Sequence, residues 1–320
     1  MAEELSRQRV LIVTVTVILC TYNRNQSLTR ALESAAGLSL PKSDEWEVLV
    51  VDNNSSDQTR EVVKDFCHRY PGRVRYLFEP HPGKSHALNT GIGEAHGDVL
   101  AFMDDDVTVE PMWLQNLTAC LHTGDWAGAG GRILPAETFS PPRWLSGKSR
   151  YSLGPLALFD LGPDAGKLSE PPFGTNMAFR REMFERYGGF RTDLGPNPAN
   201  LIRGEDTEFG SRLLAAGERL RYEPSAVVHH PVTADRTRKT YLLSWWFDKG
   251  RSEIRQQNVE FTVQRWGIPL VLLRRLAVWT VRWMLAPRPG ERFECRIKVW
   301  IIAGMIYESY HRNRRLMATS

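Results

Sequence analysis

Residues 99–106 read VLAFMDDD, in which five apolar residues run directly into three aspartates. The apolar run, within an expected strand from Asp98 to Met103, predicts a strand buried in a sheet. Adjacent carboxylates repel one another unless a cation offsets their charge, and their oxygens suit Mg²⁺ or Mn²⁺. The alternative is a solvated turn that caps a helix near Pro111. The metal interpretation places a functional site at the end of this strand.

Short β-branched runs alternate with helical stretches on the N-terminal side of this strand. The expected strands are Val10–Leu19, Trp46–Val51 and Val74–Phe78, and the expected helices are Leu28–Ala36, Thr59–Tyr70 and Lys84–Ala95. This alternation predicts βαβ units, an α/β fold and a mainly parallel sheet. Ligands bind such sheets beyond the carboxyl ends of the strands.

Polar residues gather at three of these strand ends, at residues 20–24, 51–57 and 104–106. Because parallel strands end at the same edge of a sheet, the three groups are expected to meet. Asp52 follows a fully apolar strand and is expected to face the crevice. For residues 55–57 a helix-capping role is equally compatible, since Ser and Asp are common N-cap residues.

A second pair of carboxylates, Glu205 and Asp206, follows Gly204 at an expected helix start. A carboxylate in that position can act as a general base toward an acceptor hydroxyl. The alternative is a cap that stabilises the helix dipole. Between this pair and the aspartate triplet, residues 135–172 are rich in Pro, Gly and Ser and are expected to form a long connection over the active face.

Residues 81–85 read HPGKS and end like a phosphate-binding P-loop. That motif needs a glycine five residues before its Gly-Lys pair, and the position holds Phe78, so a P-loop is excluded. Lys84 and Asn89 could still approach a diphosphate from the start of the expected helix.

Residues 10–230 resemble the family 2 glycosyltransferases, which have the A-type glycosyltransferase fold. The resemblance depends on the order and spacing of short motifs: TYNR at 21–24, VDNNSSD at 51–57, GKS with Asn89-x-Gly91 at 83–91, DDD at 104–106, GGR at 130–132, GTN at 174–176 and GED at 204–206. It implies a Rossmann-like mixed sheet flanked by helices, with a helical appendage at the C-terminus.

The resemblance also implies roles for matching residues in donor binding. Thr21, Tyr22 and Arg24 would line the nucleobase pocket, and Asp52 would accept a hydrogen bond from the base. Further contacts to the nucleotide sugar are expected from Asn54, Lys84, Asn89, Asp104 and Asp105.

The implied catalytic base is Asp206, supported by Glu205. Asp104 and Asp106 correspond to the family's Asp-x-Asp motif, with Asp104 toward the ribose and Asp106 on a Mg²⁺ or Mn²⁺ ion. Asp104, Asp106 and a strand-end histidine would form the metal site. His229 and His230 are both candidates for that histidine, with His230 preferred, and a histidine pair without this role is the alternative.

The expected activity is inverting transfer of a sugar from a nucleotide diphosphate donor, with UDP as the nucleotide, to an acceptor hydroxyl in cell-surface polysaccharide or glycolipid synthesis. Processive synthases of this family carry Gln-x-x-Arg-Trp, but Thr262 stands where the glutamine of that motif belongs. Transfer of single sugars is therefore favoured. A nucleotidyltransferase and an inactive sugar-nucleotide-binding protein are the alternatives, although the glycine-rich loop of the former is missing after the first strand.

The C-terminal region is basic, whereas the rest of the chain is acidic. Residues 235–320 hold 17 Lys and Arg against 7 Asp and Glu, and residues 1–234 hold 24 against 30. On an expected helix from Ile268 to Leu285, a stripe of Arg275, Trp279 and Arg282 borders an apolar face, as in helices that lie at lipid headgroups. Residues 301–310, followed by arginines at 312, 314 and 315, are expected to add a second such element. The alternative is a helix packed on the catalytic domain.

These features divide the chain into a catalytic domain at 1–234 and a helical region at 235–320. Four separate cysteines without a Cys-x-x-Cys pair favour a reducing compartment. Residues 10–19 are too few to span a bilayer. The expected location is the cytoplasm, on the inner face of the cell membrane, with a membrane surface and a glycan or lipid-linked acceptor as partners and no nucleic acid.

Overall fold

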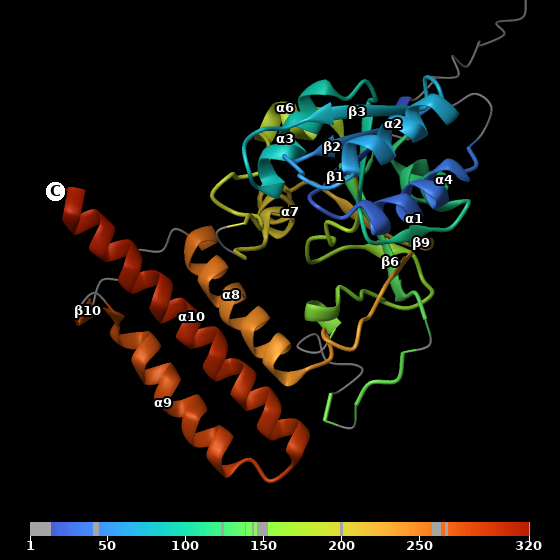
Figure 1. The fold of residues 1–320 in the computed structure, drawn as a ribbon. Helices are drawn as coiled ribbons and strands as arrows, with labels where there is room; N and C mark the ends of the chain where they lie inside the picture. The colour runs from blue at the N-terminus through green and yellow to red at the C-terminus, as the bar shows by residue number, and fades with distance from the viewer. Residues whose placement is uncertain are drawn as a thin grey trace, which may run out of the picture.

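A mixed β-sheet lies at the centre of the N-terminal part of the chain (Figure 1). The computed structural model describes residues 14–40, 45–122, 125–137, 139–142, 144–145, 153–198, 201–257, 264–265 and 268–319. Within these residues the sheet has nine strands, ordered β3-β2-β1-β4-β8-β6-β9-β5, with β7 paired to β9. The α/β fold with a mixed sheet, expected from the sequence, is confirmed.

The first four strands are parallel and follow the expected positions closely. They are β1 (Thr14–Thr21), β2 (Glu45–Asp52), β3 (Val74–Phe78) and β4 (Val99–Asp104). Residues 10–13 of the first expected strand lie outside the described residues. The register of β1 pairs Thr21 with Asp52 and Cys20 with Asp104. The three polar strand ends therefore meet at one edge, as predicted.

The second half of the sheet brings in antiparallel strands. Strand β8 (Asn176–Arg180) pairs antiparallel with β4 and with β6 (Gly128–Pro135), while β6 runs parallel to β9 (Leu220–His230). Short strands β5 (Thr108–Val109) and β7 (Gly166–Lys167) pair with β9. Residues 174–176, at the start of β8, therefore lie next to the aspartates at the end of β4.

Helices cover both faces of the sheet because successive strand residues point to opposite sides. Val17 belongs to the core under α1 (Asn25–Ala36), α2 (Thr59–Arg69) and α4 (Trp113–Thr118), which is followed by the 3₁₀ turn η1 (Ala119–Leu121). Ile18 belongs to the core under α3 (Lys84–Glu94), α6 (Arg181–Tyr187) and α7 (Glu205–Ala215). On the second face, stacked Phe184 and Phe209 hold α6 to α7, with ring centroids 4.4 Å apart.

Three long helices extend away from the sheet (Figure 1). They are α8 (Lys239–Gln257), α9 (Leu270–Leu285) and α10 (Pro289–Thr319), and the short strands β10 (Gln264–Arg265) and β11 (Ile268–Pro269) precede α9. Helix α10 contacts both α8 and α9. The predicted helix at 268–285 is confirmed as α9, and residues 301–310 form part of the longer α10. No helix in the described ranges is long and apolar enough to cross a membrane.

Two glycines bring α8 and α10 into backbone contact. A Cβ atom on Gly250 would lie 2.0 Å from the carbonyl oxygen of Ile301, and one on Gly304 would lie 2.0 Å from that of Phe247. Side chains from the connection after β6 share the core of these helices, including Leu156 in the turn η2 (Gly154–Leu156). The connection at 135–172 therefore contains η2 and β7 and packs on the helical region, which its weak periodicity did not indicate.

Candidate active site

A partly buried lysine links carboxylates from two distant parts of the chain. Lys84 begins α3, and its Nζ donates to Asp104 Oδ1 at 2.6 Å and lies 3.8 Å from Glu205 Oε1. Thr175 Oγ1 donates to the other oxygen of Asp104 at 2.6 Å. Burial opposes both charges, but the attraction between them lowers the pKa of Asp104 and raises that of Lys84. Both groups therefore stay ionised at neutral pH.

Glu205 and Asp206 begin α7 in different environments. Glu205 is buried, and burial together with the charge of Asp206 raises the pKa of Glu205 to about 7, against the opposing effect of Lys84. Asp206 is only partly buried. The two carboxylates line a small cavity with Lys84 and Asp104. The more accessible of the two is the better placed to meet a second substrate.

Backbone groups fix the orientation of Asp206. The Gly174 N–H donates to its Oδ2 and the Thr207 N–H to its Oδ1, both at 2.7 Å. A Cβ on Gly174 would lie 3.0 Å from Asp206 Oδ2, so a side chain there would press on the carboxylate. Gly204 has a φ of 95°, in the left-handed region that favours glycine. The two glycines of these motifs therefore serve the placement of one carboxylate.

Arginines surround the other two aspartates of the triplet. Arg24 Nη1 donates to Asp105 Oδ1 at 3.1 Å and to Asp106 Oδ2 at 2.9 Å, and Thr21 Oγ1 donates to Asp105 Oδ2 at 2.8 Å. Burial raises the pKa of Asp105 to about 6, and Arg24 opposes this rise. Arg236 Nη2 donates to Asp106 Oδ2 at 3.1 Å. The sequence analysis missed Arg236 because it lies in an irregular segment without a recognisable motif.

The two strand-end histidines differ in their surroundings. His230 Nε2 lies 3.8 Å from Asp106 Oδ1 and 2.7 Å from Arg236 Nη1, and the residue is buried. Burial lowers the pKa of His230. His229 Nε2 lies 3.3 Å from Glu110 Oε1 at the end of β5. Of the two candidates, only His230 reaches the aspartate cluster.

The residues expected around the nucleobase lie at the ends of β1 and β2. Tyr22 is exposed at the rim, beside buried Thr21. Asp52 is buried, and its oxygens accept from the Ser55 N–H and the Tyr76 hydroxyl, both at 2.9 Å. Asn54 is exposed and has a left-handed φ of 65°. The structure therefore puts Tyr22 and Asn54 on the surface of this edge and Asp52 beneath it.

Two other polar residues of these motifs serve to hold loops together. Asp57 accepts from the Asn25 N–H at 3.1 Å and the Thr59 N–H at 3.0 Å, which joins the starts of α1 and α2. Asn89 exchanges two 2.8 Å hydrogen bonds with the backbone of Phe190. The capping alternative for residues 55–57 fits Asp57. Asn89 is directed to Phe190 and not to the cluster, which corrects the expectation that it approaches a diphosphate.

A family model described as glycosyl transferase family 2 matches residues 16–188. The chain belongs to this family. It is accordingly a glycosyltransferase, and the nucleotidyltransferase alternative is set aside. Lys84, the three aspartates at 104–106 and Thr175 lie within the matched residues. Glu205, Asp206, His230 and Arg236 lie beyond them, and each contacts a residue within them.

Relatives and solved structures agree with this membership. The chain is 27% identical over 291 residues to the succinoglycan biosynthesis protein ExoM of Rhizobium meliloti (strain 1021), covering 90% of each chain. The mannosyltransferase PcManGT from Pyrobaculum calidifontis, solved with GDP-Man and Mn²⁺, has a TM-score of 0.64 at 19% identity, covering 95% of this chain and 89% of that one. GalNAc-T7, solved with UDP, GalNAc and Mn²⁺, has a TM-score of 0.59 at 16% identity, covering 97% of this chain and 58% of that one. The A-type fold is therefore confirmed.

A divalent ion would find two protein ligands at the aspartate cluster. The described residues contain no group of three or more His, Cys, Asp or Glu side chains arranged to hold a metal. Asp106 and His230, however, both contact the guanidinium of Arg236. The two side chains therefore already share one positively charged group, which is that of Arg236. Mg²⁺ commonly takes one or two protein ligands and completes its shell with phosphate and water. The pair fits such an ion, whereas both oxygens of Asp104 are held by Lys84 and Thr175.

Asn176, the last residue of the GTN motif, is fully buried behind the site and ties several elements together. Its Oδ1 accepts from Trp113 Nε1 at 2.8 Å, and its Nδ2 donates to the carbonyls of Arg132 and Ala226, both at 2.9 Å. Unpaired buried polar groups each cost about 1–3 kcal/mol. Asn176 therefore has a structural role despite its place in a family motif.

We expect Asn176→Ala to lower the free energy of unfolding by about 3 kcal/mol, because three buried partners lose their hydrogen bonds. Urea denaturation monitored by tryptophan fluorescence measures the change. Asn116→Ala is the matched control, since that amide donates to the Ser225 carbonyl at an exposed position. Equal stability of the two variants would contradict the structural role.

Proposed function

We propose that the chain is an inverting, metal-dependent glycosyltransferase that moves a sugar from a UDP-linked donor to an acceptor hydroxyl. The observation that carries this proposal is the partly exposed carboxylate of Asp206, held by two backbone N–H groups beside the Asp104–Lys84 pair. An inverting displacement needs one base near the acceptor. Glu205, its neighbour, is buried and less able to approach a substrate.

Asp206 would take the proton of the acceptor hydroxyl as the acceptor oxygen bonds to the anomeric carbon. The bond from that carbon to the diphosphate breaks in the same displacement, so no glycosyl-enzyme intermediate forms. Glu205, with a pKa raised to about 7 by burial and by Asp206, would support the base without carrying a full charge beside it. Lys84, already paired with Asp104, would hold the donor-side carboxylate in place.

Asp106 and His230 would hold Mg²⁺ or Mn²⁺, which neutralises charge on the departing diphosphate. Arg236 contacts Asp106 and would add positive charge near the phosphates. PcManGT and GalNAc-T7 were both solved with Mn²⁺, which supports this assignment.

Thr21, Tyr22, Arg24 and Asp52 remain our candidates for the nucleobase side, with Asn54 at the rim. UDP is the proposed nucleotide, in line with the UDP complex of GalNAc-T7, although PcManGT was solved with GDP-Man. The similarity to ExoM, a succinoglycan biosynthesis protein, supports a role in cell-surface polysaccharide or glycolipid synthesis.

We further propose that residues 1–234 form the catalytic domain and that residues 235–320 attach it to the inner face of a membrane. The exposed side of α9 carries apolar side chains: Leu270, Val271, Val278, Val281, Met284 and Leu285. Arg274, Arg275 and Arg282 are exposed on or beside that side. Apolar residues flanked by arginines are what an interfacial helix presents to lipid headgroups.

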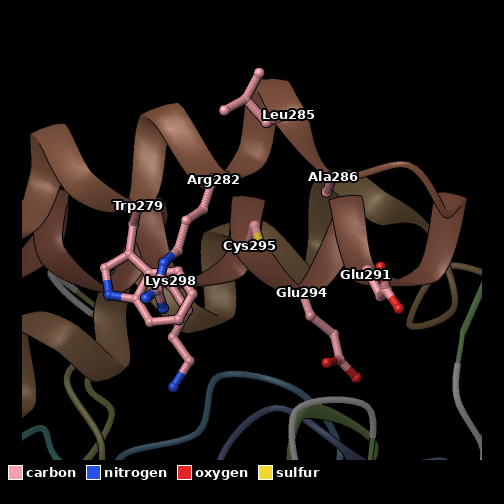
Figure 2. A pocket seen from close by; sticks show the side chains of 8 residues that line it. All are labelled: Trp279, Arg282, Leu285, Ala286, Glu291, Glu294, Cys295 and Lys298. Atoms are coloured by element: carbon pink, nitrogen blue, oxygen red, sulfur yellow. The ribbon is translucent and has the colours of Figure 1, made fainter.

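A groove between α9 and α10 also supports the proposed attachment to a membrane. It has a volume of about 420 Å³ and lies in the helical region (Figure 2). Arg282 and Lys298 approach the ring of Trp279, at 4.9 Å and 5.5 Å from its centroid. Tryptophan and basic side chains gather where a protein meets the polar layer of a membrane.

We expect Asp206→Asn to lose about 10²–10⁴-fold in turnover while the affinity for UDP barely changes, because general-base catalysis contributes that much. Turnover with a panel of nucleotide sugars and UDP affinity by calorimetry are measured on the same protein. Glu208→Gln is the matched control in the same helical turn, where Arg212 holds the carboxylate. A parallel loss of affinity would make Asp206 a binding residue, and a product that keeps the donor's anomeric configuration would refute inversion.

We expect Asp106→Asn to abolish transfer and the Mn²⁺-dependent part of UDP binding, since it removes one of two protein ligands. Calorimetry with UDP in Mn²⁺ and in EDTA measures this part. Asp98→Asn, at the opposite, exposed end of the same strand, should behave like the unaltered protein. Full activity of the unaltered protein in EDTA would remove the metal from the proposal.

We expect the double variant V281E/L285E to lose binding to phosphatidylglycerol vesicles, because two charges would enter the apolar side of α9. Cosedimentation measures binding, and UDP affinity checks that the catalytic domain is intact. Leu161→Glu is the control, because Leu161 is an exposed apolar residue of the catalytic part. Vesicle binding that survives the double substitution, or is missing in the unaltered protein, would argue against attachment through α9.

A further inference from the structure

Arg236 contacts both of the side chains that would ligate the metal ion. The residue lies in the turns between β9 and α8, where its backbone N–H donates to the Thr233 carbonyl at 3.0 Å. Its Nη1 lies 2.7 Å from His230 Nε2, and its Nη2 donates to Asp106 Oδ2 at 3.1 Å. His230 is 2% exposed and the Asp106 side chain is 12% exposed, whereas residues 233–235 are on the surface. An exposed turn thus directs one side chain into the candidate site.

The contact with His230 uses the lone pair that a metal ion would need. A guanidinium has N–H donors and no acceptor, so His230 Nε2 accepts the hydrogen bond from Arg236. The lone pair of an unprotonated imidazole nitrogen either accepts a hydrogen bond or binds a metal ion. The other ring nitrogen, Nδ1, is buried and has no hydrogen-bond partner among the described residues. Arg236 and a metal ion therefore exclude each other at Nε2.

Charge at Asp106 acts in the same direction. Arg24 Nη1 and Arg236 Nη2 both donate to Oδ2 of this aspartate, at 2.9 and 3.1 Å. A divalent ion that bound beside these guanidinium groups would be repelled by them, and like-charge repulsion is stronger where little water screens it. Binding of the ion therefore favours movement of the Arg236 side chain to another anion.

The donor diphosphate is the anion that could receive Arg236. Guanidinium groups bind phosphate oxygens through pairs of N–H donors, so the arginine would exchange one set of charged partners for another. Its guanidinium contacts Asp106 and His230, and its backbone lies in a turn at the surface. Movement of the side chain would therefore leave the sheet and the helices in place.

We propose that Arg236 makes metal binding depend on the nucleotide, because it occupies Asp106 and His230 in the free protein and passes to the donor diphosphate when the ion enters. The inference rests on the proposed function, in which these two residues hold the ion beside the diphosphate. The ion alone must displace Arg236 without compensation, whereas the ion together with a nucleoside diphosphate gives the guanidinium a new partner. The two ligands should bind cooperatively, and each should raise the affinity for the other by the same factor.

Mn²⁺ binding to the full chain, followed by electron paramagnetic resonance with and without saturating UDP, tests this coupling. Without UDP we expect Arg236→Ala to bind Mn²⁺ about tenfold more tightly than the unaltered protein, within the usual range of coupling between sites. The factor by which UDP tightens Mn²⁺ binding should fall about tenfold in the same variant. Arg238→Ala is the matched control, because it removes the same charge two residues further on, from an exposed pair with Asp235. Both affinities should be unchanged in that control.

The outcomes separate this inference from the proposed function. Equal tightening of Mn²⁺ binding in Arg236→Ala and Arg238→Ala would show an effect of net charge and overturn the inference. Unchanged Mn²⁺ affinity of Arg236→Ala without UDP would also overturn it, and either result leaves the proposed function standing if UDP binding still responds to Mn²⁺. If the alanine variant unfolds, Arg236→Met keeps the aliphatic part of the side chain and decides in its place. UDP binding that does not respond to Mn²⁺ in the unaltered protein would remove the metal from the proposed function and refute this inference with it.

Discussion

The candidate site depends on the partly buried ion pair between Lys84 and Asp104. The pair joins the start of α3 to the end of β4. Thr175, the residue before β8, donates a hydrogen bond to the same aspartate. Loss of either partner would leave the other charge without its counter-ion. Because Glu205 also lies 3.8 Å from Lys84, the same ammonium sets the position of α7 and hence of Asp206. Lys84 thus contacts both the end of β4, through Asp104, and the start of α7, through Glu205.

The helical region contributes to this arrangement as well as to the proposed membrane contact. Ser252 and Gln256 of α8 hold the backbone at Arg203 and Gly204. Arg255 and Arg251 of α8 in turn share the two carboxylate oxygens of Glu308 on α10, at 2.6 and 3.1 Å. The basic residues that the sequence presents as one positively charged tail therefore divide into two groups. Some build the contact between helices, and others face outward on α9.

The sheet was predictable because the strands of its first half are apolar runs that end in polar motifs. Register then brings Thr21 beside Asp52 and Cys20 beside Asp104 without further information. The partners of individual side chains were not predictable, since they come from residues far away in the chain. Arg236 reaches Asp106 across 130 positions, and Asn89 turns to Phe190 across 101. Motif spacing identifies residue types at an edge, but tertiary packing decides which side chains face the cavity.

The glycine contacts between α8 and α10 have a mechanical consequence. Where Gly250 meets the Ile301 carbonyl and Gly304 meets the Phe247 carbonyl, no layer of side chains separates the two backbones. Sliding between packed helices requires side chains that can change rotamer, and these two points offer none. The two helices are therefore held together as one unit, and through Ser252 and Gln256 this unit contacts the residues that precede α7.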